Sequence, residues 1–276
     1  MYDENNRRIR RWTVEEAQEL VLREPPHDSH MSRDWSTQKA GETWDEAVRM
    51  MIDGDPKSAR GLKKYLGVLA RVRQGKRSLT RWGEAGSQVD VARFLSGEPE
   101  CMMETVRARR AAPVLKIAVE RCVPHYVTAE EIRATGASVL AVVEALRTSG
   151  VPSEVWVTFS INTNYSRDGG SYSLSEQVLV QEAGYALDLD RLAFWVGNPA
   201  SFRRLGFALF EQEPQAVRDK FNIKTTGSYG SASSSPPNED EFDEAAPSWS
   251  SDAETWLRAV LDRRAGIDVL DVKEER

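Results

Sequence analysis

A strand, a helix and a second strand follow one another between residues 114 and 161, and this order restricts the fold more than any other feature. An apolar run begins at Val114, a capping box formed by Thr128 and Glu131 opens a long helix, and a second strand starts at Glu154. This order is typical of a parallel βαβ unit. The sequence therefore predicts the α/β class, with a mostly parallel sheet flanked by helices.

The chain divides into two predicted regions. Residues 1–112 are predicted as a helical N-terminal region, because capping boxes such as the one at Thr13 open amphipathic helices. Residues 113–276 are predicted as the α/β domain, which contains a disordered insertion at about 225–251 that is rich in Ser, Gly, Pro and acidic residues. A last strand is predicted at 267–272, where apolar and polar residues alternate.

Composition limits the class of protein. The formal net charge of −6 argues against a protein that coats DNA by electrostatics alone. The two cysteines, Cys101 and Cys122, do not make a disulfide framework, which fits a reducing compartment. The N-terminus lacks the apolar core of a secretory signal, and no apolar run approaches the roughly 18 residues of a membrane helix. We expect a cytoplasmic protein with no membrane partner.

Residues 60–81 carry basic side chains and no acidic one. Tyr65 and Trp82 lie nearby, and base stacking combined with positive charge is how proteins hold single-stranded nucleic acids. The candidate nucleic-acid-binding residues are Lys63, Lys64, Arg71, Arg73, Lys76, Arg77 and Arg81. The alternative interpretation of this stretch is a solvated helix face.

The turn after the first strand of the βαβ unit carries no glycine-rich phosphate loop and no cluster of metal ligands. Cys122 and His125 have a spacing that allows a nucleophile and its base, but no third group that orients the histidine is evident, which favours a buried cysteine. His27 and His30 are possible zinc ligands together with Cys101 or Cys122, yet their separation in sequence favours a solvated loop. We predict no catalytic residue, no metal site and no cofactor.

Two further groups of charged residues have alternative interpretations. Asp90, Glu98 and Glu100 are the carboxylates that a Mg²⁺-dependent nuclease would use, although a turn built by the neighbouring glycine and proline explains them better. Arg203 and Arg204 are possible contacts for a phosphate or for a partner's carboxylate. A helix whose apolar residues face the core is the favoured interpretation of that segment.

Two stretches, Val89–Met102 and Glu182–Phe194 followed by Pro199–Phe207, resemble an uncharacterised group of phage and actinobacterial proteins. The resemblance covers about residues 35–215 and implies a phage or prophage origin. It also implies an α/β domain similar to von Willebrand factor A domains, or more generally a Rossmann-like sheet. Metal-binding von Willebrand domains carry Asp-x-Ser-x-Ser after the first strand. The segment Glu120–Pro124 has a cysteine and a proline in place of the hydroxyl groups, so the resemblance implies a degenerate metal site.

These observations lead to one hypothesis for function and two alternatives. The leading hypothesis is a non-enzymatic binding or adaptor protein, encoded by a phage, that acts in a nucleic-acid-associated complex in the host cell cytoplasm. The first alternative is a metal-dependent nuclease or hydrolase. The second is a scaffold that contacts only protein.

Overall fold

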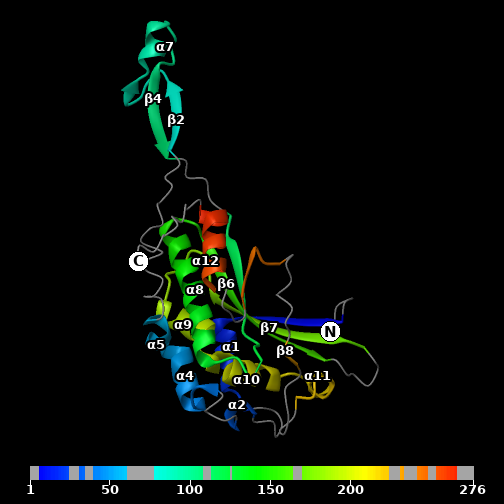
Figure 1. Cartoon of the computed structure of the whole chain (residues 1–276). Coiled ribbons are helices and arrows are strands. Elements are labelled where there is room, and N and C mark those ends of the chain that lie inside the picture. The colour runs from blue at the N-terminus through cyan, green and yellow to red at the C-terminus, as the bar shows by residue number, and fades with distance from the viewer. Residues whose placement is uncertain are drawn as a thin grey trace.

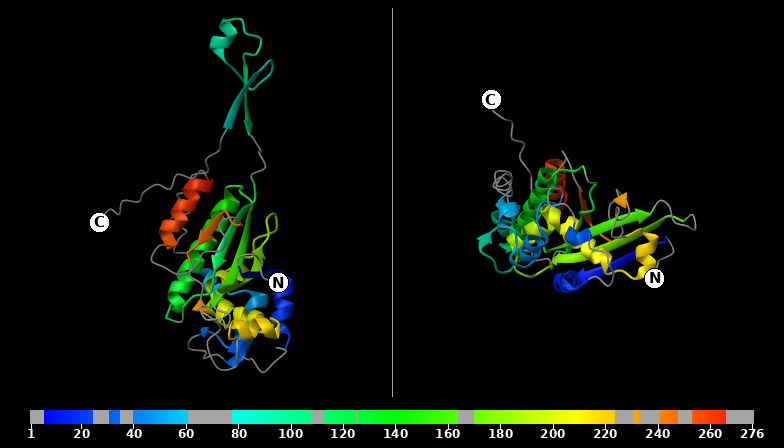
Figure 2. Two further views of the ribbon diagram at one scale, coloured as in Figure 1. Left: turned by 90° about the vertical axis from the view of Figure 1, so that its right-hand side faces the viewer. Right: turned by 90° about the horizontal axis from the view of Figure 1, so that it is seen from below.

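A computed structural model of the chain describes residues 6–24, 31–34, 40–60, 78–107, 113–124, 126–163, 170–223, 231–232, 241–247 and 253–265. Within these ranges the chain forms a main sheet with helices packed on it, and a small sheet that lies apart from the main one (Figures 1 and 2). We call the main sheet with its helices the body, and we call residues 78–107, which form the small sheet, the arm.

The main sheet has the strand order β1-β7-β6-β5-β9, and β8 pairs with the far end of β6. Three of the four neighbouring pairs on this path are parallel, and the β6–β7 pair is antiparallel. This arrangement confirms the predicted α/β class with a mostly parallel sheet flanked by helices. The strands are β1 (Arg7–Thr13), β5 (Leu115–Glu120), β6 (Ser153–Thr163), β7 (Tyr172–Gln181), β8 (Ser231–Ala232) and β9 (Glu244–Ala246).

The predicted βαβ unit is present as β5, α8 (Ala129–Thr148) and β6, with the two strands parallel. The capping box forms as expected. The Thr128 hydroxyl accepts a hydrogen bond from the backbone N–H of Glu131, and the Glu131 carboxylate accepts one from the N–H of Thr128. The capping box predicted at Thr13 likewise begins α1 (Val14–Leu22). These helix starts depend on contacts within one turn, which is why the sequence reveals them.

The described part of the predicted helical region 1–112 also contains strands. Strand β1 pairs with β7 in parallel and so adds an edge strand to the sheet of the body. Arginines occupy four of its seven positions, so the strand lacks the apolar alternation by which the sequence would predict it. Helices α4 (Trp44–Asp53) and α5 (Pro56–Arg60) contact α9 and belong to the body as well.

One face of the main sheet is aliphatic and packs against the helices. Side chains from alternate positions of the strands, such as Ile117, Val157 and Val178, lie in one cluster with residues of α8 and α9. The backbones of α8 and α9 touch at Gly136, where a Cβ atom would lie 2.3 Å from the Cα of Gly197. The remaining helices of the body are α2 (Met31–Asp34), α9 (Leu189–Gly197), the π-helical turn η2 (Ser201–Gly206), α10 (Phe207–Glu211), α11 (Gln215–Lys220), α12 (Ala253–Val260) and the π-helical turn η3 (Leu261–Ala265).

Strand β7 begins at Tyr172, and serines and Glu176 occupy its first half. The stretch 225–251, predicted as a disordered insertion, contains β8 and also β9, which pairs in parallel with β5. The strand predicted at 267–272 lies outside the described residues.

The arm is a three-stranded antiparallel sheet in the order β2-β4-β3, with a short helix beside it. Its elements are β2 (Ser78–Gly83), β3 (Gln88–Val89), α7 (Val91–Leu95) and β4 (Met102–Arg107). Figure 1 and the left view of Figure 2 show it extending away from the body, with α7 at the far end. We call this far end, residues 82–103, the tip of the arm.

Candidate functional site

Strand β5 ends in a buried carboxyl group, that of Glu120, at the edge where open α/β sheets carry their sites. One oxygen of Glu120 accepts hydrogen bonds from the backbone N–H groups of Cys122 and Ser160, at 2.7 and 3.2 Å. The other oxygen accepts one from the Thr158 hydroxyl at 2.9 Å. Burial raises the pKa of Glu120 to about 7 even though these hydrogen bonds oppose the shift. The carboxyl group can therefore hold a proton near neutral pH.

The surroundings of Glu120 are filled by the protein itself. Arg121 is buried beside it, and burial lowers the pKa of Arg121 to about 10, with Arg203 adding to the effect. A guanidinium nitrogen of Arg203 donates to the carbonyl oxygen of Val127 at 3.0 Å. Cys122, the candidate nucleophile, is only 1% exposed, as the buried-cysteine interpretation predicted. Residues 120–123 are therefore packed in the interior, and the Cys122 thiol is enclosed there.

The candidate metal ligands do not gather in the described part of the chain. Cys101 lies on the arm and Cys122 lies at the end of β5, while His27, His30 and His125 fall outside the described residues. Across the described ranges, no group of three or more His, Cys, Asp or Glu side chains is arranged to hold a metal ion.

The three carboxylates considered for Mg²⁺ all lie on the arm, and two of them hold its tip together. Asp90 caps α7 by accepting a hydrogen bond from the backbone N–H of Arg93 at 3.3 Å, and it accepts another from the Trp82 indole at 3.1 Å. These hydrogen bonds lower the pKa of Asp90. The Arg93 guanidinium stacks on Trp82 at 4.8 Å, pairs with Glu98 at 3.4 Å and donates to the backbone carbonyl of Glu100.

The apolar side chains at the tip point into solvent. Val91 and Phe94 are each 63% exposed and Leu95 is 79% exposed, although all three are large hydrophobic residues on a short, capped helix. No side chain between Trp82 and Met103 is buried. A small sheet without a buried core is only marginally stable in water, and residues 82–103 supply no buried side chain. Large exposed apolar groups in one place typically mark an interaction site.

The predicted nucleic-acid-binding residues fall mostly outside the described residues, namely Lys63, Lys64, Arg71, Arg73, Lys76 and Arg77. Arg81 lies on β2, where its backbone pairs with that of Glu104 on β4. In sequence, this basic stretch leads directly into the arm.

Arg203 and Arg204 lie in η2 and are both buried. Nitrogens of Arg204 donate to the backbone carbonyls of Ser32, Arg33 and Glu42, at 3.0, 2.9 and 3.1 Å. Arg204 therefore joins the segments around α2 and α4 to the core instead of presenting its charge to a phosphate. The apolar residues near these arginines are buried, as predicted, and they are Phe202, Leu205, Phe207 and Leu209.

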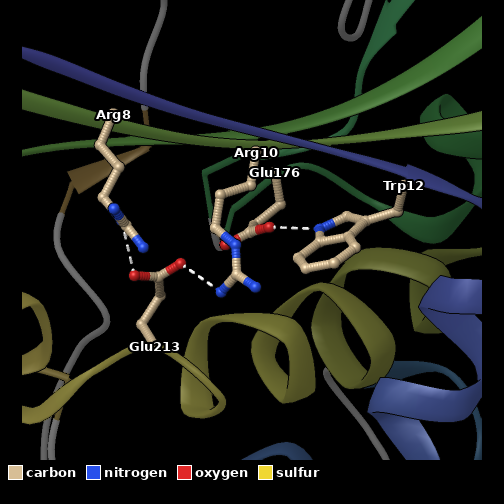
Figure 3. A network of polar contacts seen from close by, with 5 residues as sticks. All are labelled: Arg8, Arg10, Trp12, Glu176 and Glu213. Atoms are coloured by element: carbon tan, nitrogen blue, oxygen red, sulfur yellow. Dashed lines mark hydrogen bonds and ion pairs between the residues drawn. The ribbon is translucent and has the colours of Figure 1, made fainter. Parts of the chain in front are cut away.

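A polar network that the sequence did not reveal lies between the sheet and the helices (Figure 3). Arg8 and Arg10 of β1 each donate to the carboxylate of Glu213 at 2.7 Å. The indole of Trp12 donates to Glu176 of β7 at 2.6 Å. Both glutamates are 0% exposed. The sequence gives no clear signal for this network, because β1 is rich in arginine and Glu176 lies in the polar half of β7.

The two glutamates of this network have pKa values shifted in opposite directions. Burial and the neighbouring Glu213 raise the pKa of Glu176 to about 8. Burial opposes ionisation of Glu213 too, but the hydrogen bonds from Arg8 and Arg10 outweigh it and lower the pKa of Glu213. At neutral pH, Glu176 is therefore protonated and Glu213 is ionised. This chemistry suits a structural network, because both carboxyl groups are fully enclosed.

Among the described helices, none combines the length and apolarity that crossing a membrane requires. In comparisons with known proteins, a family model described as a domain of unknown function, DUF7192, matches residues 6–261. No curated protein and no solved structure matches the chain.

Proposed function

The chain belongs to the DUF7192 family of unknown function, and we propose that it is a non-enzymatic binding protein that acts as an adaptor in a nucleic-acid-associated complex. One observation carries this proposal. The arm keeps Val91, Phe94 and Leu95 in solvent at the end farthest from the body. Exposed apolar groups on a projecting element are typical of a docking surface.

The packing of the body also supports the proposal. The strand end that would carry a site in an α/β enzyme is filled by Arg121, Cys122 and Arg203. An adaptor requires only a stable body and a surface that reaches a partner. The arm provides such a surface, and the basic stretch that precedes it in sequence supplies positive charge.

Nucleic-acid contact is the second part of the proposal, and it rests on the basic residues from Arg60 to Arg81, among which no acidic residue occurs. Each lysine or arginine that neutralises a phosphate releases a counterion, so such binding weakens steeply as salt rises. We further propose, from the resemblance, that the sheet is a degenerate von Willebrand A-like or Rossmann-like one and that the protein is phage-encoded and works in the host cytoplasm.

The experiment that tests this function is a pull-down of the tagged full chain from native host cells, with and without nuclease. Three proteins are compared: the wild type, Phe94→Ser/Leu95→Ser on the arm, and Lys63→Ala/Lys64→Ala in the basic stretch. We expect one set of partners to disappear with the arm variant. A second set, or co-purifying nucleic acid, should disappear with the lysine variant and with nuclease.

Two results would replace the proposal with its alternatives. Hydrolysis of nucleic acid by the purified chain with Mg²⁺ or Mn²⁺, lost on Asp90→Ala or Glu98→Ala, would establish the metal-dependent nuclease or hydrolase. If every partner is indifferent to both nuclease and the lysine variant, and no nucleic acid co-purifies, the protein is a scaffold that contacts only protein. The variant Tyr185→Ser is the matched control, because Tyr185 is 71% exposed but lies on the body.

A further inference from the structure

The three most exposed apolar residues of the tip occupy helical positions that place them on one side of α7. Val91, Phe94 and Leu95 stand at positions i, i+3 and i+4, and these positions lie next to each other on a helix surface. The same spacing is found in short helices that insert their apolar side chains into a groove of a partner protein. Val91, Phe94 and Leu95 therefore form one apolar surface on α7, which we call the anchor.

The polar contacts of the tip hold this anchor in a fixed orientation. Asp90 caps the helix, Trp82 donates to Asp90, and Arg93 stacks on Trp82 and reaches Glu98. The two contacts with Trp82 connect α7 to β2, and the others lie within the helix and the turn after it, so the apolar residues remain on the exposed surface. A helix that is oriented before binding loses less conformational freedom when it docks.

Charge at the tip narrows the class of partner. Between residues 82 and 103, the acidic residues are Glu84, Asp90, Glu98 and Glu100, whereas the single basic residue is Arg93. Arg93 is already paired with Glu98 and stacked on Trp82. The tip therefore combines exposed apolar groups with a net negative charge. Such a surface is complementary to an apolar surface with basic residues around it.

We infer that α7 docks into an apolar groove of a partner protein, and that lysine or arginine residues line the rim of that groove. This inference rests on the proposed adaptor function and adds the chemistry of the partner. An anionic membrane or a nucleic acid would bring its negative charge against the acids of the tip. A second copy would bring one acidic tip against another.

The test begins with photo-crosslinking of the full chain in native host cells. A photoreactive amino acid replaces Ala92, which is exposed between the anchor residues, and in a matched chain it replaces Tyr185 on the body. We expect the probe at position 92 to label one protein, which mass spectrometry identifies. The labelled peptide should contain apolar residues with lysine or arginine close by.

The identified partner is then purified, and its affinity for four versions of the chain is measured. Phe94→Ser/Leu95→Ser should raise Kd by about 30-fold or more, because apolar side chains at the centre of an interface carry most of the binding free energy. Glu84→Lys/Glu100→Lys reverses two exposed acids of the tip and leaves the Arg93–Glu98 pair in place, so it should raise Kd by about tenfold, mainly through slower association, and should reduce the dependence of binding on salt. Tyr185→Ser should bind like the wild type. Replacing the partner's basic residues with acidic ones should restore binding of the Glu84→Lys/Glu100→Lys variant.

Three results would overturn the inference while leaving the adaptor function standing. The first is a partner labelled only by the probe on the body. The second is flotation of the chain with vesicles of phosphatidylcholine and phosphatidylglycerol that requires Phe94 and Leu95. The third is a dimer in sedimentation equilibrium that the Phe94→Ser/Leu95→Ser variant abolishes. If neither probe labels any protein and no partner co-purifies with the chain, the adaptor function fails together with the inference.

Discussion

The body and the arm of this protein use their hydrophobic residues in opposite ways. In the body, large side chains such as Phe159, Phe194 and Trp195 are 0% exposed and pack between the sheet and its helices. On the arm, Phe94 and Leu95 are mostly exposed, and the tip is held by hydrogen bonds, an ion pair and a cation–π contact. The body therefore buries its large apolar side chains within itself, whereas the tip of the arm leaves Phe94 and Leu95 exposed.

Replacing a phenylalanine with alanine should give the largest difference in stability between the two regions. Phe159→Ala removes a fully buried ring that stacks near Phe202, so it should lower the free energy of unfolding by about 3–5 kcal/mol. Phe94→Ala removes a ring that is 63% exposed, and it should change stability by about 0.5 kcal/mol or less. Urea unfolding followed by circular dichroism measures both. Equal effects would mean that Phe94 is part of the folded core.

The buried network gives the next largest effect. Glu213→Gln leaves the guanidinium groups of Arg8 and Arg10 without their carboxylate partner, and the expected loss of stability is about 3 kcal/mol. The control is Glu144→Gln, which breaks the surface pair with Arg147. That variant should unfold at the same urea concentration as the wild type. If Glu213→Gln left the free energy of unfolding unchanged, Arg8 and Arg10 would have to find other partners or water in the variant.

The same network predicts how stability depends on pH. The pKa of Glu176 is raised to about 8 in the folded chain, so its stabilising contribution is complete below its unfolded value and is lost as pH rises toward 8. Between pH 6 and 8 the loss should amount to roughly 2 kcal/mol, because each pKa unit is worth about 1.4 kcal/mol. Burial shifts the pKa of Glu120 in the same direction, to about 7, so Glu120 contributes in the lower half of this window.

The variant Glu176→Gln sharpens this prediction, because an amide keeps the size and polarity of the protonated carboxyl group but cannot ionise. Its unfolding free energy should fall less between pH 6 and 8 than that of the wild type. Glu182→Gln, at an exposed position just after β7, should keep the wild-type dependence. A slope unchanged by Glu176→Gln would mean that Glu176 does not hold the proton.

Removing a helix cap should have the smallest effect on stability, and the effect should differ between the body and the arm. Thr128→Ala removes the cap of α8 in the body and should cost about 1 kcal/mol of global stability. Asp90→Ala removes the cap of α7 on the arm. It should speed amide exchange at the tip while leaving global unfolding unchanged, because few contacts couple the tip to the core. Hydrogen exchange by mass spectrometry measures both, and protection lost across the body on Asp90→Ala would contradict this separation.

The sequence alone was sufficient for features that depend on neighbouring residues. The βαβ unit and the capping boxes at Thr13 and Thr128 follow from alternation, helical period and spacing along the chain. The buried state of Cys122 and the core position of the residues around Arg204 were predicted as well. The class of the fold was therefore decided by local pattern.

Only the tertiary structure decided the remaining features, because they join residues that are far apart in the chain. Strand β1 is rich in arginine and becomes a strand because β7 pairs with it, and Glu213 binds two arginines more than 200 positions away. The apolar residues of α7 look in sequence like those of any amphipathic helix. They remain in solvent because no described element packs over them, and a sequence pattern specifies which residues share a face but not what that face meets.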